Sequence, residues 1–320
     1  MYSVIIIGAG LSGVMAARTL MESGVQNILL VEKSKSVGGR LATRRLEKGH
    51  VDHGAQFFTV RTEDLQSEVN EWLSHGWVRE WYRDPYPKFI APEGMNSLIK
   101  RLSKSLPVRL RSKVTEVKKL DSYVEVLTED GKRFQGEKLI VTAPLPQTID
   151  LVQEIGQVDK LLEIPYNACY VGIIRCAESK DIGANGHVTN YLPEGMERVV
   201  NQLQKGITDE AIYAIYMTGS WSNQHWKLSD NVVKEKMMDS MATILDPSVI
   251  NEFQLKRWRY AESSKVIRDP YVEICCQPSV VVCGEVFLRQ DDTASRTRFE
   301  SAFISGIEAG RYVGNRHLER

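Results

Sequence analysis

The sequence predicts an α/β fold in which a Rossmann-like domain with a parallel sheet is interleaved with a β-rich (α+β) domain. The first observation is the N-terminal stretch SVIIIGAGLSGVMAARTL, residues 3–20, which is typical of a β-branched strand, a glycine turn and an amphipathic helix. The second is a set of segments with alternating apolar positions, among them residues 167–175 and 210–219, which predict strands. A chain of 320 residues can form one large domain or two interleaved ones.

The composition excludes several classes of function. The chain has 41 Lys and Arg and 41 Asp and Glu residues, so it lacks the basic excess that suits nucleic acid or an anionic membrane as a partner. No apolar run approaches membrane-spanning length, and the apolar start lacks the basic leader of a signal peptide. The five cysteines show no CxxC spacing, which is typical of reduced thiols. We expect a cytoplasmic protein without a metal, nucleic-acid or membrane partner.

The N-terminal glycines predict a dinucleotide site. Gly8 permits the tight turn, Gly10 lets the backbone approach a pyrophosphate, and Gly13 lets the helix pack close to the strand. The helix starts at Leu11 and Ser12, where free N–H groups and the positive end of the helix dipole favour phosphate. This stretch alone is compatible with both NAD and FAD.

A second strand, QNILLVEK, supports the same site. It ends at Glu32 and Lys33, and Glu32 follows Gly13 by nineteen residues. A carboxylate at this place accepts hydrogen bonds from both ribose hydroxyls of an adenosine.

A second glycine pair distinguishes the two cofactors. The GGR triplet of residues 38–40 follows that carboxylate, and Thr43, Asp52 and Gly54 come after it. This order resembles the first motif of the flavin amine oxidase superfamily. The resemblance implies that the loop at Gly39 covers the FAD pyrophosphate and that Arg40 neutralises part of its charge. Since neighbours on a strand point apart, we expect one of Arg44 and Arg45 to face the dinucleotide, and the resemblance places Arg44 among the cofactor contacts.

The resemblance continues through the middle of the FAD-binding part. The segment APEGMNSLIKRL, with Gly94 and Met95, resembles the family's passage past the flavin ring into a helix, for which Asn96 is the expected N-cap. Residues 108–144 predict a run of strands with a Glu-Asp-Gly turn. The resemblance places Val114 at the adenine and puts under the dinucleotide a loop of three residues, Thr142, Ala143 and Pro144.

The C-terminal part resembles the family's closing motif. The buried strand VVVCGEVF includes Gly284 and Glu285, and ESAFISGIEAGRYV follows as a helix. The resemblance implies that Glu285 contacts the ribityl chain or the pyrophosphate. It also implies that the helix opens at Ser305 and Gly306, with its positive end at the flavin. No cysteine follows Cys283, so we expect noncovalent FAD.

Three segments, GGRLATRR, DHGAQFFTVR and APEGMNSL, most resemble bacterial renalase-type oxidases. Asp52, Gly54, Ala55 and Gln56 carry the D-x-G-A-Q element of that family among the cofactor contacts. The resemblance places Gln56 and Phe57 near the flavin ring, and we take both as catalytic candidates. The resemblance implies transfer of a hydride from an isomeric dihydro-NAD(P) to flavin N5, with O2 as the electron acceptor and H2O2 as a product.

The predicted FAD-binding domain comprises residues 1–60, 90–150 and 271–320, and the predicted substrate domain comprises 61–89 and 151–270. GSWSNQHWKLS and KRWRYAESS bring aromatic and basic residues to the second domain, and from them we take Trp221 and His225 as catalytic candidates at the substrate site. The other members of these two segments are Trp226, Trp258, Arg259 and Tyr260.

Three alternatives stay open at this point. They are a flavin amine oxidase or desaturase on another small substrate, an FAD-binding protein without turnover, and an NAD-dependent dehydrogenase. The last requires both the GGR triplet and the Ser305-Gly306 pair to be coincidental.

Overall fold

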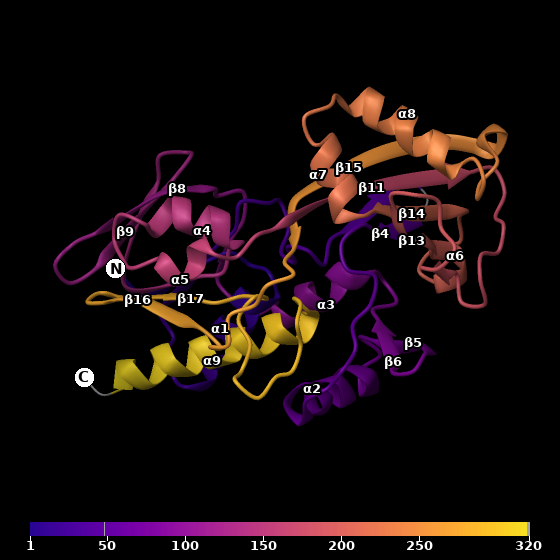
Figure 1. Cartoon of the computed structure of the whole chain (residues 1–320). Helices are drawn as coiled ribbons and strands as arrows, with labels where there is room; N and C mark the ends of the chain where they lie inside the picture. Colours follow the sequence, from indigo (N-terminus) through magenta and orange to yellow (C-terminus); the bar gives the residue numbers. More distant parts are fainter. Residues whose placement is uncertain (48, 319–320) are drawn as a thin grey trace.

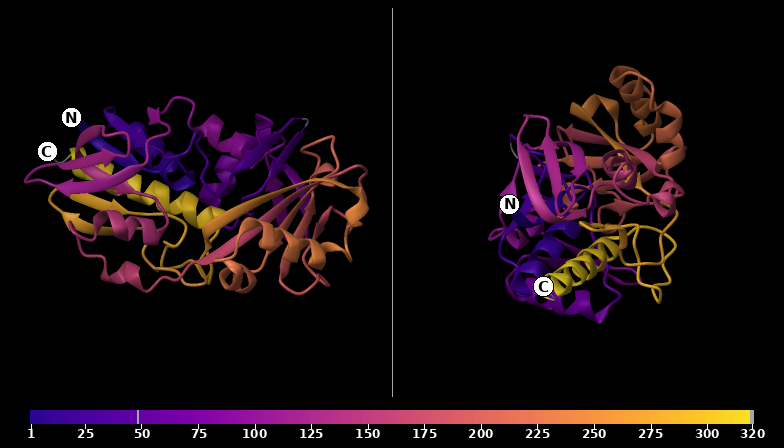
Figure 2. Two further views of the ribbon diagram at one scale, coloured as in Figure 1. Left: turned by 90° about the horizontal axis from the view of Figure 1, so that it is seen from above. Right: turned by 90° about the vertical axis from the view of Figure 1, so that its left-hand side faces the viewer.

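The computed structural model describes residues 1–47 and 49–318, which form two lobes side by side (Figures 1 and 2). One lobe is built on an eight-stranded sheet and the other on a five-stranded sheet. The long strands β11 (Asn167–Cys176) and β15 (Ile250–Glu262) lead from the first lobe into the second and back, so the chain crosses between the lobes. The predicted α/β fold with an interleaved β-rich part is confirmed.

The eight-stranded sheet is parallel at its centre. Strand β1 (Tyr2–Ile7) pairs in parallel with β2 (Ile28–Val31) and with β10 (Arg133–Val141). Strand β17 (Ser279–Val282) extends this parallel set beyond β10. The central strands are apolar runs buried on both faces, as parallel strands covered by helices require. The remaining strands of the sheet are β7 (Val108–Arg109), β8 (Val114–Lys119), β9 (Val124–Thr128) and β16 (Val272–Cys276).

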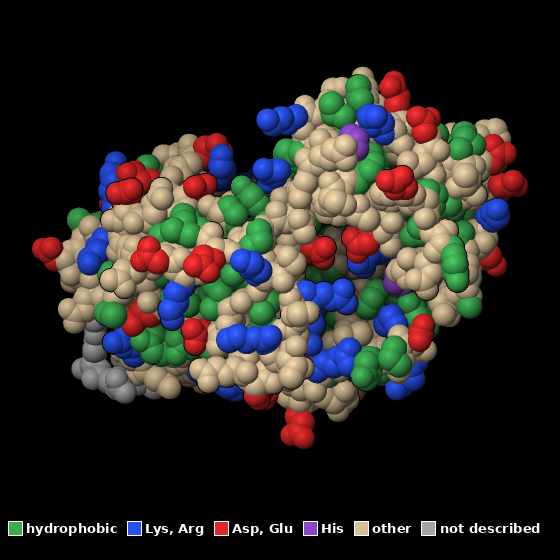
Figure 3. Space-filling model, in the orientation of Figure 1, with side chains coloured by type: hydrophobic (Ala, Val, Ile, Leu, Met, Phe, Trp, Pro, Cys, Tyr) green, Lys and Arg blue, Asp and Glu red, His purple; other side chains and the backbone are tan. Residues whose placement is uncertain are grey.

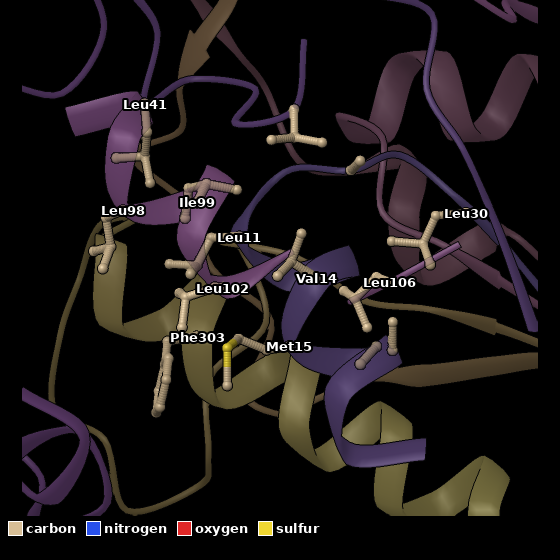
Figure 4. Close-up of a cluster of buried hydrophobic side chains, with 14 of the residues drawn as sticks. Leu11, Val14, Met15, Leu30, Leu41, Leu98, Ile99, Leu102, Leu106 and Phe303 are labelled. Atoms are coloured by element: carbon tan, nitrogen blue, oxygen red, sulfur yellow. The ribbon is translucent and has the colours of Figure 1, made fainter. Parts of the chain in front are cut away.

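Helix α1 (Leu11–Glu22) packs against the long helix α9 (Phe299–Leu318). Apolar side chains of α1, of α3 (Met95–Leu102) and of α9 meet in one core, and Figure 4 shows Leu11, Met15, Leu102 and Phe303 pointing toward one another. Gly306 brings α9 close to α1, because a Cβ at this position would lie 2.3 Å from the backbone oxygen of Ser12. The predicted opening of the helix at Ser305-Gly306 is therefore wrong: both residues lie inside α9.

The five-stranded sheet is antiparallel and has different partners on its two faces. Its order is β12 (His187–Val188), β13 (Met196–Asn201), β14 (Ile212–Met217), β11 and β15. Helices α7 (Gly219–His225) and α8 (Asp230–Met241) cover one face, with Met237 and Met241 in the core. The hairpin of β3 (Thr43–Leu46) and β4 (Gly49–Asp52) lies against the other face.

Residues 61–89, which the sequence assigns to the substrate domain, contact both lobes. Helix α2 (Glu63–Ser74) contributes Leu65, Val69 and Trp72 to the core of the first lobe, beside α9. The hairpin of β5 (Arg79–Arg83) and β6 (Pro87–Ile90) follows it. The helix joins this core because its apolar residues recur at helical spacing and so share one face.

The remaining helices are short. They are α4 (Leu145–Val152), α5 (Asp159–Leu162), α6 (Gln202–Lys205) and the 3₁₀ turn η1 (Pro247–Val249). Over the described ranges, no helix has both the length and the apolar character that crossing a bilayer requires. All five cysteines are free thiols.

Candidate functional site

A large cleft runs between the two lobes. Its volume is about 2020 Å³, and Figure 3 shows the molecule hollowed here, with acidic and basic side chains at the rim. Ligand pockets for one small molecule measure roughly 300–1,000 Å³, so the cleft has room for a dinucleotide and a second ligand. Of the described residues that line it, sixteen are Lys or Arg and seven are Asp or Glu. This basic excess contrasts with the neutral chain as a whole.

The turn between β1 and α1 forms one wall of the cleft. A Cβ at Gly8 would lie 2.5 Å from the hydroxyl of Thr142, and a Cβ at Gly13 would lie 2.0 Å from the carbonyl of Gly8. A Cβ at Gly10 would meet no atom within 4 Å, because this side of the turn faces the open cleft. No side chain caps the first N–H groups of α1. The turn therefore fits a phosphate group, which would take the place that a Cβ at Gly10 would fill.

Glu32 is buried at the end of β2, with both carboxylate oxygens fixed by the backbone. Oε2 accepts a hydrogen bond from the N–H of Ala9 at 2.9 Å, and Oε1 accepts one from the N–H of Ser34 at 2.7 Å. A carboxylate has lone pairs left after two such bonds, so Glu32 can still accept from a ribose hydroxyl.

Arg40 lies in the cleft with partners of its own. Its guanidinium forms an ion pair with Glu285 and donates to the carbonyls of Tyr260 and Ala261, and the hydroxyl of Tyr166 donates to Glu285 at 2.7 Å. Burial opposes the charge of Glu285, but Arg40 and the hydrogen bonds together lower its pKa. A pyrophosphate at the GGR loop would share Arg40 with this carboxylate.

The structure brings most of the predicted site residues to the cleft. The eighteen that line it are Gly8, Gly10, Leu11, Ser12, Glu32, Lys33, Gly39, Arg40, Arg44, Gly54, Ala55, Gln56, Phe57, Val114, Thr142, Ala143, Pro144 and Glu285. The nine that do not line it are Gly13, Asp52, Gly94, Met95, Trp221, His225, Gly284, Ser305 and Gly306.

Asp52 and its neighbours support the site from behind. The carboxylate of Asp52 accepts a hydrogen bond from Lys205 Nζ at 2.6 Å, and both side chains are fully buried. Asp52 also accepts the N–H of Met95 at 2.9 Å, and the hydroxyl of Thr43 accepts the N–H of Asn96 at 3.0 Å. The predicted N-cap at Asn96 is therefore wrong, because Asp52 and Thr43 satisfy these N–H groups at the start of α3.

The conformation of Gly94 and the burial of Met95 explain their distance from the cleft. Gly94 has a φ of +88°, and a Cβ there would lie 2.4 Å from the side chain of Thr43. Met95 is a core residue. Gly284 and Ser305 join β17 to α9 through a hydrogen bond of 2.9 Å from the Gly284 N–H to the Ser305 hydroxyl. The end of α9 that faces the cleft is at Phe299, which with Ala302 lines it.

Trp221 and His225 lie on the wrong face of the five-stranded sheet for the predicted role. Their rings stack at 4.2 Å, and Trp221 packs edge-on against Tyr170 under helix α7. Successive residues of a strand point to opposite faces, so Tyr170 faces these helices while its neighbour Cys169 faces the cleft.

Trp258 is the tryptophan of these segments that lines the cleft. It pairs in register with Cys169, and its indole N–H donates to the carbonyl of His53 at 2.7 Å. Its ring stacks on that of His53 at 5.5 Å. The hydrogen bond and the stacking hold the indole in one position.

Tyr216 and the charged residues beside it line the cleft although no motif of the sequence indicated them. The Tyr216 hydroxyl contacts the Gln56 amide and donates to the carbonyl of Gly54 at 2.8 Å. Arg198 forms an ion pair with Glu197, and Glu262 has its pKa raised by burial and by Glu197. The alternation of residues along the predicted strands could have identified Tyr216 and Trp258 as residues that face the cleft. The contact between Gln56 and Tyr216 joins residues far apart in the sequence, so no local pattern indicates it.

Two family models match the chain. The NAD(P)-binding Rossmann-like domain matches residues 6–73, and the flavin containing amine oxidoreductase family matches residues 72–313. Renalase from Mus musculus is 29% identical over 194 residues, which are 53% of this chain and 57% of the mouse protein. Putrescine oxidase from Kocuria rosea is 31% identical over 91 residues, 28% of this chain and 18% of that enzyme. The chain thus spans less than two thirds of the length of these relatives.

A solved structure extends the likeness in fold to the whole chain. Cyclohexylamine oxidase from Brevibacterium oxydans IH-35A superposes with a TM-score of 0.70 over 100% of both chains, at 14% sequence identity. At this identity the likeness concerns the fold. Because one family model covers most of the sequence, the chain belongs to the flavin containing amine oxidoreductase family, whose members are flavin-dependent oxidoreductases.

Proposed function

We propose that the protein is an FAD-dependent oxidase of an anionic, reduced nucleotide, an isomeric dihydro-NAD(P), with O2 as the electron acceptor. The observation that carries this proposal is the charge of the cleft, where sixteen basic and seven acidic residues line one cavity. FAD carries two phosphates, and so large an excess suits a second phosphorylated ligand. A cleft lined mainly by one sign of charge also raises the local concentration of substrates of the opposite sign.

In this proposal the first lobe holds the cofactor. The turn at Gly10 and the start of α1 take the pyrophosphate together with Gly39 and Arg40, and Glu32 takes the ribose. Val114 and the loop of residues 142–144 border the same part of the cleft. Bound FAD would supply the two-electron acceptor and pass the electrons to O2. We propose noncovalent binding, since Cys283 is buried and burial raises the pKa of its thiol to about 12.

The second lobe shapes the substrate end in this proposal. Trp258, fixed by its bond to His53, and Tyr216 present flat rings to the cleft, and Phe57 lines it as well. These rings suit stacking with a dihydropyridine and exclude water around it. Tyr216 and Lys205 contact the side-chain amide of Gln56 and hold it in place, so Gln56 forms a fixed part of the cleft wall.

An amine substrate is the main alternative, and Glu197 and Glu262 are the carboxylates that would attract it. Glu197 already pairs with Arg198, and burial together with Glu197 raises the pKa of Glu262. The ion pair of Glu197 and the raised pKa of Glu262 both weaken the attraction of these carboxylates for an ammonium group. This supports a nucleotide rather than an amine as the substrate.

Anaerobic mixing tests the proposal. We expect the 2- and 6-dihydro isomers of NAD(P) to bleach the flavin absorbance of the purified holoenzyme, and air to restore it with release of H2O2. Bleaching by amines alone would show that the protein is an amine oxidase and would overturn the proposal. A flavin that neither class bleaches would favour an FAD-binding protein without turnover.

A further inference from the structure

Three cations gather at one place beside the cleft. Arg44, Lys256 and Lys35 are among the basic residues here that form no ion pair with any carboxylate of the described ranges, whereas Arg40 and Arg198 do form one. Arg44 and Lys35 line the cleft. Unpaired cations near one another repel, so such a group gains stability from a bound anion.

The hairpin of β3 and β4 turns Arg44 toward the second lobe. Arg44 pairs in register with Val51, and side chains directly opposite each other on paired strands share a face. Val51 is fully buried against Val171 of the five-stranded sheet. Arg45, which pairs with His50, therefore lies on the other face of the hairpin, where it is exposed at another part of the cleft and its charge repels that of Lys100.

Lys256 reaches the same place from β15. It is two residues from Trp258, so both side chains point to the face of the sheet that meets the hairpin. Burial and the nearby charges of Arg44 and Lys35 lower the pKa of Lys256. The three cations thus come from β3, from β15 and from the loop after β2, and they interact electrostatically.

Two buried nitrogens at this place lack a partner. Arg44 Nε and His53 Nδ1 have no hydrogen bond with any described residue, although both are shielded from solvent. Burial, followed by the charges of Lys256 and Arg44, lowers the pKa of His53 to about 4. An unpaired buried N–H costs about 1–3 kcal/mol, and a phosphate oxygen would satisfy it.

We propose that Arg44, Lys256 and Lys35 form a phosphate-binding subsite, beside Trp258, for a phosphate group of the nucleotide substrate. The assignment to the substrate rests on the proposed function; the anion site itself does not. FAD is the other source of phosphate, and the sequence resemblance placed Arg44 with it. The location of Arg44, turned toward Val171 and Trp258 of the second lobe, favours the substrate.

The test compares Arg44→Gln and Lys256→Gln with the control Arg45→Gln, which removes the neighbouring exposed cation. Circular dichroism establishes that each variant folds. Three quantities are then measured on the holoenzymes: FAD retention, the Kd of dihydro-NADP and dihydro-NAD from anaerobic flavin reduction, and the rate with a phosphate-free N-alkyl dihydronicotinamide. Calorimetric titration with inorganic pyrophosphate measures anion binding without turnover.

We expect each of the two variants to raise the nucleotide Kd about tenfold and to leave FAD retention and the phosphate-free rate unchanged. Arg45→Gln should change the nucleotide Kd less than twofold. Unchanged nucleotide affinity in both variants would overturn the subsite. Loss of FAD with unchanged nucleotide affinity would show that these residues bind a phosphate of FAD, and it would overturn the assignment to the substrate.

Calorimetric titration with pyrophosphate tests the anion site independently of the proposed function. If no dihydropyridine nucleotide bleaches the wild-type flavin, the proposed function fails. The anion site is then supported if pyrophosphate binds the wild type and Arg45→Gln but not the other two variants. It is overturned if pyrophosphate binds all four proteins alike or none of them.

Discussion

Arg40 joins three parts of the chain that are distant in sequence. It pairs with Glu285 after β17 and donates to Tyr260 and Ala261 at the end of β15, while Tyr166, just before β11, donates to the same carboxylate. A residue that the GGR motif assigns to the cofactor therefore also holds the two segments that cross between the lobes.

Arg40→Ala should weaken both FAD binding and folding. Loss of a charge-assisted contact costs about 1.5–3 kcal/mol of FAD affinity. Removing one partner of a fully buried ion pair costs about 3–5 kcal/mol of unfolding free energy, and the cost here is at the low end or below, because Glu285 is buried but Arg40 is partly exposed. Equilibrium dialysis of FAD and urea unfolding of the apoprotein measure the two effects separately.

The double variant Arg40→Ala/Glu285→Gln is the matched control. It should regain much of the unfolding free energy, since no buried charge is left unpaired, and it should not regain FAD affinity. Full recovery of FAD affinity in the double variant would contradict a contact between Arg40 and the pyrophosphate.

The pairing of Asp52 with Lys205 could not be predicted from the sequence. Spacing along the chain indicated Asp52 as part of a motif, but its partner Lys205 is 153 positions away in a four-residue helix. A lysine in such a stretch is ordinarily a solvated side chain. Only the approach of α6 to the β3–β4 hairpin shows that it is buried and paired.

At the scale of elements, the packing of α9 on α1 depends on single glycines. A Cβ at Gly306 would lie 2.3 Å from a backbone oxygen of α1, whereas a Cβ at Gly314 would lie 3.4 Å from the Ser23 side chain. Both glycines are in the same helix, so an alanine changes helix propensity similarly at each. A difference between the two variants therefore reports the close packing at Gly306.

Gly306→Ala should lower the melting temperature and the FAD content, because α9 has to move away from Ser12 at the start of α1. Gly314→Ala should leave both unchanged or raise the melting temperature, since alanine favours a helix by about 1 kcal/mol over glycine. Scanning fluorimetry and flavin absorbance measure the two properties. Equal behaviour of the two variants would contradict the close contact at Gly306.

Local patterns predicted elements well where one segment supplied all the information. The strand, turn and helix of residues 2–22 follow from β-branched residues, glycines and helical spacing within one stretch, and the structure confirms them. The start of α9 was wrong for a non-local reason. Ser305 and Gly306 resemble a helix opening, but they are small because they meet β17 and α1.

For the whole molecule, two half-buried histidines predict how stability depends on pH. Burial is the main cause that lowers the pKa of His53 and of His187 to about 4, with nearby cations adding to it. Unfolded histidine takes up a proton near pH 6.5, so between pH 6.5 and 4 the unfolded chain binds more protons than the folded one. The free energy of unfolding should therefore fall as the pH falls through this range.

The expected slope is about 1.4 kcal/mol per pH unit for each of these histidines. Urea unfolding at several pH values between 7 and 4 measures it. The double variant His53→Gln/His187→Gln should show a shallower slope. A slope equal to that of the wild type would contradict the assignment of the effect to these two side chains.

The cleft also shows why the substrate end was harder to predict than the cofactor end. The glycine turn, Glu32 and the GGR triplet lie within the first 40 residues and follow a recognisable order. Trp221 and Trp258 look equally suitable in the sequence. They differ in the face of the five-stranded sheet on which they lie, and α7 fixes that face for Trp221.

The contact between α1 and α9 has a consequence for synthesis. A ribosome that has released the first half of the chain has exposed the apolar face of α1, but the helix that covers it, Phe299–Leu318, is translated only after residues 23–298. The nascent chain must keep this face from aggregating until α9 leaves the exit tunnel. A dinucleotide site that depends on this contact can therefore form only after α9 is released, and a chaperone that shields α1 would act during that interval.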